Sequence, residues 1–114
     1  MHFALLLILH WVADFVLQTD YEATNKSKSF KILCKHTMLY AVVVTAVYGT
    51  LFQNALMIVL TLVWLFVTHT AIDFVTSRWT SKLYSEGKRH DFFVVIGFDQ
   101  LLHNLTLLAI SLYM

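Results

Sequence analysis

The sequence predicts an all-α membrane protein, a four-transmembrane-helix up-down bundle with both termini on the non-cytoplasmic side. Of its 114 residues, 59% are hydrophobic and 13% are charged, and proline is absent. Four apolar stretches each have close to the roughly 20 residues that a bilayer span needs. All eight lysine and arginine residues fall in two segments, one after the first stretch and one after the third.

The chain is expected to form one domain over residues 1–114. The first helix begins at the initiator methionine without the basic segment or cleavage site of a signal peptide, so we expect it to be retained. Ser29 is the expected N-cap of the second helix, Gly87 is expected to end the third, and Asp91 to cap the fourth. The predicted helices are about 1–18, 30–53, 54–84 and 92–114.

The distribution of basic residues predicts the orientation. Loops rich in lysine and arginine stay in the cytoplasm, which places both basic segments there. Anionic headgroups explain these side chains, so the expected partner is the lipid bilayer and not a nucleic acid. The single cysteine, Cys34, cannot form an internal disulfide and is expected to be a small apolar filler. The basic residues are Lys26, Lys28, Lys31, Lys35, Arg78, Lys82, Lys88 and Arg89.

Three histidine–aspartate pairs interrupt the apolar stretches. Within each pair the spacing is four residues, so both side chains lie on one face of a helix. A charge inside the bilayer costs roughly 3 kcal/mol on insertion scales, and such residues usually mark a working site. The first and third helices also share the pattern His-x-x-x-Asp-Phe-Val, which suggests an internal duplication. The pairs are His10/Asp14, His69/Asp73 and Asp99/His103.

The predicted topology gathers these pairs in the cytoplasmic half of the bundle. Helices that run toward the cytoplasm carry histidine first, and the returning fourth helix carries aspartate first. At about 1.5 Å per residue, the aspartates should therefore lie roughly 6 Å nearer the cytoplasm than the histidines. His36, near the start of the second helix, has no aspartate four residues away but falls at a matching depth.

Imidazole and carboxylate ligands together suit zinc, manganese or iron. Zinc is the most favoured of these divalent ions. Because the candidates exceed the four ligands of one tetrahedral zinc, they favour two ions roughly 3.5–4 Å apart, or one ion with carboxylates that orient the imidazoles. His36 is expected to complete the ligand set or to act as the catalytic acid or base. The predicted metal ligands are His10, Asp14, His69, Asp73, Asp99 and His103.

Four further residues are candidates for substrate contact. Gln18 continues the stripe formed by His10 and Asp14, although such amides more commonly hydrogen-bond between helices. Lys26, Lys28 and Arg78 could steer an anionic head group, although their side chains also reach lipid headgroups by snorkelling.

A purely structural role is the main alternative for the three pairs. Polar contacts between membrane helices contribute only about 0.6 kcal/mol on average. Such contacts would not require ionisable residues on three helices at one depth. A functional site is therefore the favoured interpretation.

Three strings also carry a resemblance to a known family. They are His10-Trp-Val-Ala-Asp14-Phe-Val-Leu-Gln18, His69-x-x-x-Asp73 and Gly97-Phe-Asp99-Gln100-x-x-His103. Together they resemble a family of small bacterial and phage membrane proteins known as domain of unknown function 3307. The resemblance covers nearly the whole chain and implies a multi-pass protein of the bacterial inner membrane, but no activity. A looser likeness connects the chain to bacterial inner-membrane metal-dependent hydrolases, whose motifs it does not reproduce.

The function that we expect is a membrane-embedded, metal-dependent hydrolase. It would act on a lipid or lipid-linked phosphate or ester from the cytoplasmic leaflet. A small proton- or metal-coupled transporter, working as a dimer, is the first alternative, with the pairs as a relay. A haem protein would use one histidine from each helix but gives the aspartates no role. A non-catalytic membrane regulator is the last alternative.

Overall fold

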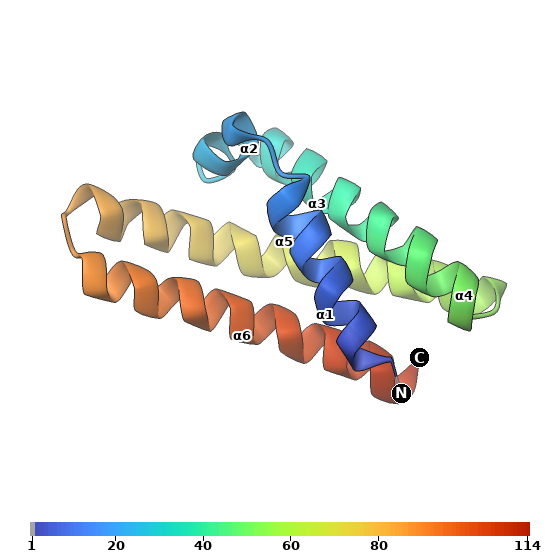
Figure 1. The fold of residues 1–114 in the computed structure, drawn as a ribbon. Coiled ribbons are helices and arrows are strands. Elements are labelled where there is room, and N and C mark those ends of the chain that lie inside the picture. Colours follow the sequence, from blue (N-terminus) through green and yellow to red (C-terminus); the bar gives the residue numbers. More distant parts are fainter. Residues whose placement is uncertain (1) are drawn as a thin grey trace.

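The computed structural model describes residues 2–114, which form helices and contain no β-strand. The prediction of an all-helical fold is therefore confirmed. Figure 1 shows both termini at one end of the molecule and the turn between the last two helices at the other. The elements are α1 (Phe3–Trp11), the π-helical turn η1 (Val12–Val16), α2 (Asp20–Asn25), α3 (Phe30–Val44), the π-helical turn η2 (Thr45–Gly49), α4 (Thr50–Phe52), α5 (Ala55–Ser85) and α6 (Arg89–Tyr113).

Three helical runs are long and apolar enough to cross a membrane: Phe30–Phe52, Ala55–Ser85 and Arg89–Tyr113. The N-terminal helical segment, Phe3–Val16, is also apolar but shorter than these three. At about 1.5 Å per residue it covers at most roughly 21 Å, less than the roughly 30 Å of a bilayer's hydrocarbon core. The predicted count of four spans is therefore not confirmed, and neither is the predicted side of the termini.

Two of the three residues predicted to begin or end helices do so in the structure. The Ser29 side chain accepts a hydrogen bond from the Ile32 N–H at 3.4 Å, so Ser29 caps α3 as predicted. Gly87 has a φ of 71°, in the left-handed region that favours glycine, and ends α5 as predicted. This tight reversal lets α6 begin at Arg89, so Lys88 and not Asp91 is its N-cap residue.

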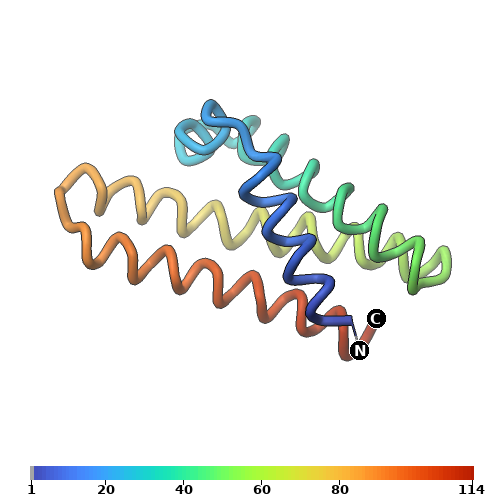
Figure 2. Tube along the Cα trace, viewed as in Figure 1, coloured from blue at the N-terminus to red at the C-terminus, as the bar shows by residue number. Residues whose placement is uncertain are grey.

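The two ends of the bundle are filled differently. Near the termini, the core is apolar and includes Leu6, Leu65, Leu107 and Ile110, each at most 1% exposed. The α1 helix packs against α6 and α3, while η1 and α2 pack against α3. Figure 2 shows α1 next to α6 near the termini and then diverging from it toward α2. This path leaves the α5–α6 hairpin uncovered by α1 near its turn, and the polar residues lie toward that end.

Candidate metal centre

Four buried residues form the first group that could hold a metal ion. Asp14 on η1, His36 on α3, and His69 and Asp73 on α5 each offer one ligand atom, and these atoms all lie within 4.8 Å of one another. The Nε2 atom of His36 is 3.0 Å from the Asp14 Oδ1 atom. The Nε2 atom of His69 is 3.2 Å from the Asp73 Oδ2 atom. Two imidazoles and two carboxylates are the number of ligands that a tetrahedral metal site requires.

A second group shares Asp73 with the first and adds Asp99 and His103 from α6. The His103 Nε2 atom is 3.0 Å from the Asp73 Oδ1 atom and 3.4 Å from the Asp99 Oδ1 atom. Asp73 thus turns its Oδ2 atom toward His36 and His69 and its Oδ1 atom toward His103. This orientation is the one a carboxylate needs to bridge two ions.

His69 provides the strongest indication that these groups bind a cation. Its side chain is 1% exposed, and neither ring nitrogen has a hydrogen-bond partner among residues 2–114. Its Nε2 atom nevertheless lies 3.3 Å from the Asp14 Oδ1 atom and 3.2 Å from the Asp73 Oδ2 atom. Leaving a buried polar group unpaired costs about 1–3 kcal/mol. A metal ion held between the Nε2 atom and the two carboxylates would remove this cost for that nitrogen.

His10 was expected to be a metal ligand, but the structure does not bring it into either group. Its Nδ1 atom is 2.8 Å from the Tyr40 hydroxyl, and its Nε2 atom is 2.8 Å from the Gln100 Oε1 atom. The nearest carboxylate oxygen of Asp14 lies 3.8 Å from the Nε2 atom. Both nitrogens of His10 are therefore used in hydrogen bonds to other helices.

The bonds of His10 connect it to the second group. The Gln100 Oε1 atom can only accept, so His10 donates from Nε2 and accepts from the Tyr40 hydroxyl at Nδ1. The Gln100 Nε2 atom in turn donates to the Asp99 Oδ2 atom at 2.9 Å. The Thr76 hydroxyl donates to the other oxygen, Oδ1, at 2.5 Å. Gln100 was expected to hydrogen-bond between helices, whereas Tyr40 and Thr76 were not predicted to have these roles. Gln100 and Thr76 bond to Asp99 directly, and Tyr40 acts through His10.

Lys26 reaches the centre from the segment that follows α2. Its Nζ atom is 3.3 Å from the Asp73 Oδ2 atom. Burial acts to lower the pKa of the Lys26 ammonium, but the charges of Asp73, Asp14 and Asp99 outweigh it and raise the pKa above its ordinary value. Lys26 is therefore a cation that pairs with Asp73 and lies near Asp14 and Asp99.

A cavity of about 650 Å³ opens from the centre toward the two basic segments. Asp14, Asp73 and Asp99 line it, whereas no histidine among the described residues does. The aspartates thus lie between the histidines and the basic segments, which is the order that the sequence spacing suggests. The cavity gives the carboxylates access to small molecules from one end of the bundle.

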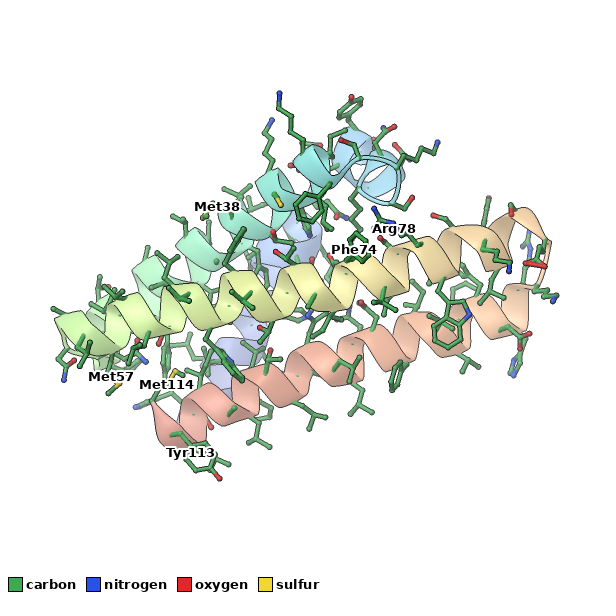
Figure 3. The ribbon with its side chains drawn as sticks, turned by 180° about the vertical axis from the view of Figure 1, so that it is seen from behind. Met38, Met57, Phe74, Arg78, Tyr113 and Met114 are labelled. Atoms are coloured by element: carbon green, nitrogen blue, oxygen red, sulfur yellow. The ribbon has the colours of Figure 1, made fainter. Side chains whose placement is uncertain are left out.

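The predicted substrate contacts separate into two sets. Gln18, Lys26 and Lys28 all line the cavity. Arg78 does not, because its guanidinium lies 3.8 Å from the centre of the Phe74 ring and donates to the Phe74 carbonyl oxygen at 2.9 Å. Figure 3 shows Arg78 and Phe74 beside each other along α5. The structure therefore places three of these four residues at the cavity.

Comparison with known proteins gives a family but no activity. The family model described as protein of unknown function (DUF3307) matches residues 2–114. No curated protein and no solved structure matches the chain. Because the match extends over almost the whole chain, the protein belongs to the DUF3307 family.

Proposed function

We propose that this protein is a membrane-embedded, metal-dependent hydrolase. Its substrate would be a lipid or lipid-linked phosphate or ester that reaches the centre from the cytoplasmic leaflet of the bacterial inner membrane. The observation that carries this proposal is His69, whose Nε2 atom has no hydrogen bond yet lies 3.2–3.3 Å from two carboxylates that line a cavity. Buried, unpaired ligand atoms beside an accessible cavity are what a catalytic metal site requires.

The residues divide into three roles under this proposal. Asp14, His36, His69 and Asp73 would bind one ion, and Asp73, Asp99 and His103 a second. Zinc, manganese or iron suits this ligand set, and such an ion would lower the pKa of bound water and polarise a phosphoryl or carbonyl oxygen. His36, expected either to complete the ligand set or to act as an acid or base, is assigned as a ligand because it offers one of the four ligand atoms that lie within 4.8 Å of one another.

The surroundings of the centre support a lipid substrate. The outward faces of the three spanning helical runs expose large apolar side chains, among them Val59, Val63 and Val67 on α5, each more than half exposed. The cavity is lined by residues of α5 and α6 near the turn between them. Figure 2 shows that α1 does not cover this part of the hairpin. A lipid could therefore keep its chains in the bilayer while its head group enters the cavity.

The packing of the other half disfavours the transporter alternative. Alternating access requires a path from the polar centre to each side of the membrane. Beyond the histidines, the bundle is closed by Leu6, Leu65, Leu107 and Ile110, which are at most 1% exposed. Haem ligation is also disfavoured, because the His69 and His103 rings stack on each other with centroids 4.1 Å apart.

The proposal is tested with purified protein supplied with zinc, manganese or iron in detergent. Vesicles of phosphatidylglycerol and of phosphatidic acid are added, and released phosphate, glycerol phosphate and fatty acid are measured. We expect metal-dependent release that is lost in Asp73→Asn and kept in Thr68→Val, whose hydroxyl bonds to the Trp64 carbonyl away from the cavity. Metal-bound protein that releases no product, but moves protons across liposome membranes, would contradict the hydrolase and favour the transporter.

A further inference from the structure

The cavity beside the metal centre has a polar wall, of which only Thr76 bonds to a residue of the centre. Five serine and threonine residues of α5 line it, and those three, four and seven residues after Asp73 lie on the same helix face as Asp73. Ser27 and Thr24 line the opposite side, and the Ser27 hydroxyl accepts from Ser81 at 2.9 Å. The five residues, which we name the hydroxyl face, are Thr76, Ser77, Thr80, Ser81 and Ser85.

Two atoms on the cavity wall lack partners. Ser77 is 8% exposed, and its Oγ atom has no hydrogen-bond partner among residues 2–114. The buried Oε1 atom of Gln18 is also without a partner in the described part of the chain. A buried hydroxyl and a buried amide oxygen are costly to leave unpaired, so both are suited to a polar ligand in the cavity.

The charges of the cavity wall restrict the class of ligand. The base carries Asp14, Asp73 and Asp99, and the only cations among the described lining residues are Lys26 and Lys28. Without metal, three carboxylates would repel an anion more than two lysines attract it. With one or two divalent ions bound, the same base would attract a phosphate, and Lys26 would lie beside it.

Beyond the base, the wall offers hydroxyl and amide groups rather than charges. The Thr80 hydroxyl donates to the Ser77 carbonyl, which leaves its oxygen free to accept from a ligand. Such groups match an alcohol that carries several hydroxyls. The apolar side chains of Phe15, Phe92 and Ile96 also line the cavity, where the lipid portion would leave it.

We infer that the cavity binds a phosphate ester of a polyhydroxylated alcohol, such as glycerol or a sugar, as the head group of a lipid. The phosphate lies at the metal centre beside Lys26, and the hydroxyls of the alcohol bond to Ser77, Thr80 and Gln18. This inference rests on the proposed metal centre and names the substrate class of the proposed hydrolase.

The test compares equilibrium binding of two soluble probes, glycerol 1-phosphate and methyl phosphate, to metal-loaded protein by calorimetry. Both probes carry the phosphate, but only the first carries further hydroxyls. Two additional hydrogen bonds should make glycerol 1-phosphate bind on the order of tenfold more tightly. Equal affinities for the wild-type protein would overturn the inference without any variant being needed.

Two double variants then test which residues cause the preference for glycerol 1-phosphate over methyl phosphate. The Ser77→Ala/Thr80→Val double variant should lose the preference for glycerol 1-phosphate while its metal content and its affinity for methyl phosphate stay unchanged. The matched control is Ser111→Ala/Thr68→Val, which removes another buried, unpaired Ser Oγ atom and another intrahelical Thr bond outside the cavity. An equal loss in this control would also overturn the inference.

The result separates this inference from the proposed function. A preference for glycerol 1-phosphate without any hydrolysis would support the binding site and contradict the hydrolase. Hydrolysis with no difference between the probes would support the hydrolase and contradict the head-group site. Binding that persists after the metal is removed with a chelator would contradict the assignment of the phosphate to the metal centre.

Discussion

Residues 10–16 and 69–75 share the pattern His-x-x-x-Asp-Phe-Val, but their histidines have opposite surroundings. In the first segment, both ring nitrogens of His10 are hydrogen-bonded, to Tyr40 and Gln100. In the second, both ring nitrogens of His69 lack hydrogen-bond partners within residues 2–114. The distance from Nε2 to the nearest carboxylate oxygen of the aspartate four residues on is 3.8 Å for His10 and 3.2 Å for His69.

The comparison shows that spacing places a pair on one helix face but does not decide its role. Residues 12–16 form a π-helical turn, whereas residues 69–75 continue a regular α-helix. Such turns often occur at functional sites, and this one carries Asp14 into the first ligand group. Hydrogen bonds to Tyr40 on α3 and Gln100 on α6 occupy both ring nitrogens of His10. The His69 ring instead faces the carboxylates of Asp14 and Asp73.

The largest effect is expected for Asp73, because it belongs to both ligand groups. Asp73→Asn should reduce the affinity for metal more than about 100-fold, beyond the 10–100-fold that supporting residues usually cost. Asp14→Asn, which alters the first group alone, should leave an ion at the second. Elemental analysis of the purified variants measures the metal per chain, and equal losses in the two variants would show that Asp73 is not shared.

The second prediction tests the two histidines directly. His69→Gln should remove the ion of the first group, whereas His10→Gln should lower metal affinity only about 10–100-fold, as expected of a residue that acts through Asp99. Competition with a chromogenic chelator gives both affinities. A greater loss in His10→Gln than in His69→Gln would reverse the roles assigned here.

A smaller effect is expected at Tyr40, whose hydroxyl bonds to His10. Tyr40→Phe leaves the His10 Nδ1 atom buried and unpaired, which should cost about 1–3 kcal/mol of stability. Tyr48→Phe is the matched control, since this buried tyrosine has no side-chain hydrogen bond within the described residues. Thermal unfolding in detergent compares them, and equal melting temperatures would argue against the His10 network.

The smallest effect on the metal is expected at Lys26, which pairs with the Asp73 Oδ2 atom. Lys26→Met removes a cation that competes for this oxygen, so metal affinity should rise, by less than about tenfold. Methyl phosphate should bind more weakly. Lys88→Met, at an exposed pair with Glu86, should change neither affinity. A loss of metal in Lys26→Met would show that Lys26 supports the centre instead of competing with the ion.

Much of this arrangement could be predicted from local sequence. Ser29 and Gly87 cap and end helices through short-range backbone chemistry, so single-sequence reasoning finds them. The matched depth of Asp14, Asp73 and Asp99 follows from helix direction and rise alone. These features depend on neighbours in the chain, which the sequence displays directly.

Other features depend on contacts between distant segments. The bonds of His10 join residues 30 and 90 positions apart, and no sequence period indicates them. The predicted first helix, about residues 1–18, is longer than the observed one, because Leu17 is apolar although the helix ends at Val16. The sequence does indicate part of the hydroxyl face, since Thr76, Ser77 and Thr80 follow Asp73 at helical spacings of three, four and seven.

The proposed function depends on metal binding by the buried histidines and aspartates. Elemental analysis of the detergent-purified protein, beside the His69→Ala/Asp73→Ala double variant, tests it most directly. We predict one or two zinc, manganese or iron ions per chain, absent from the double variant while its helical circular dichroism is unchanged. A folded wild-type protein that holds no metal, and takes up none when these ions are added, would contradict the claim.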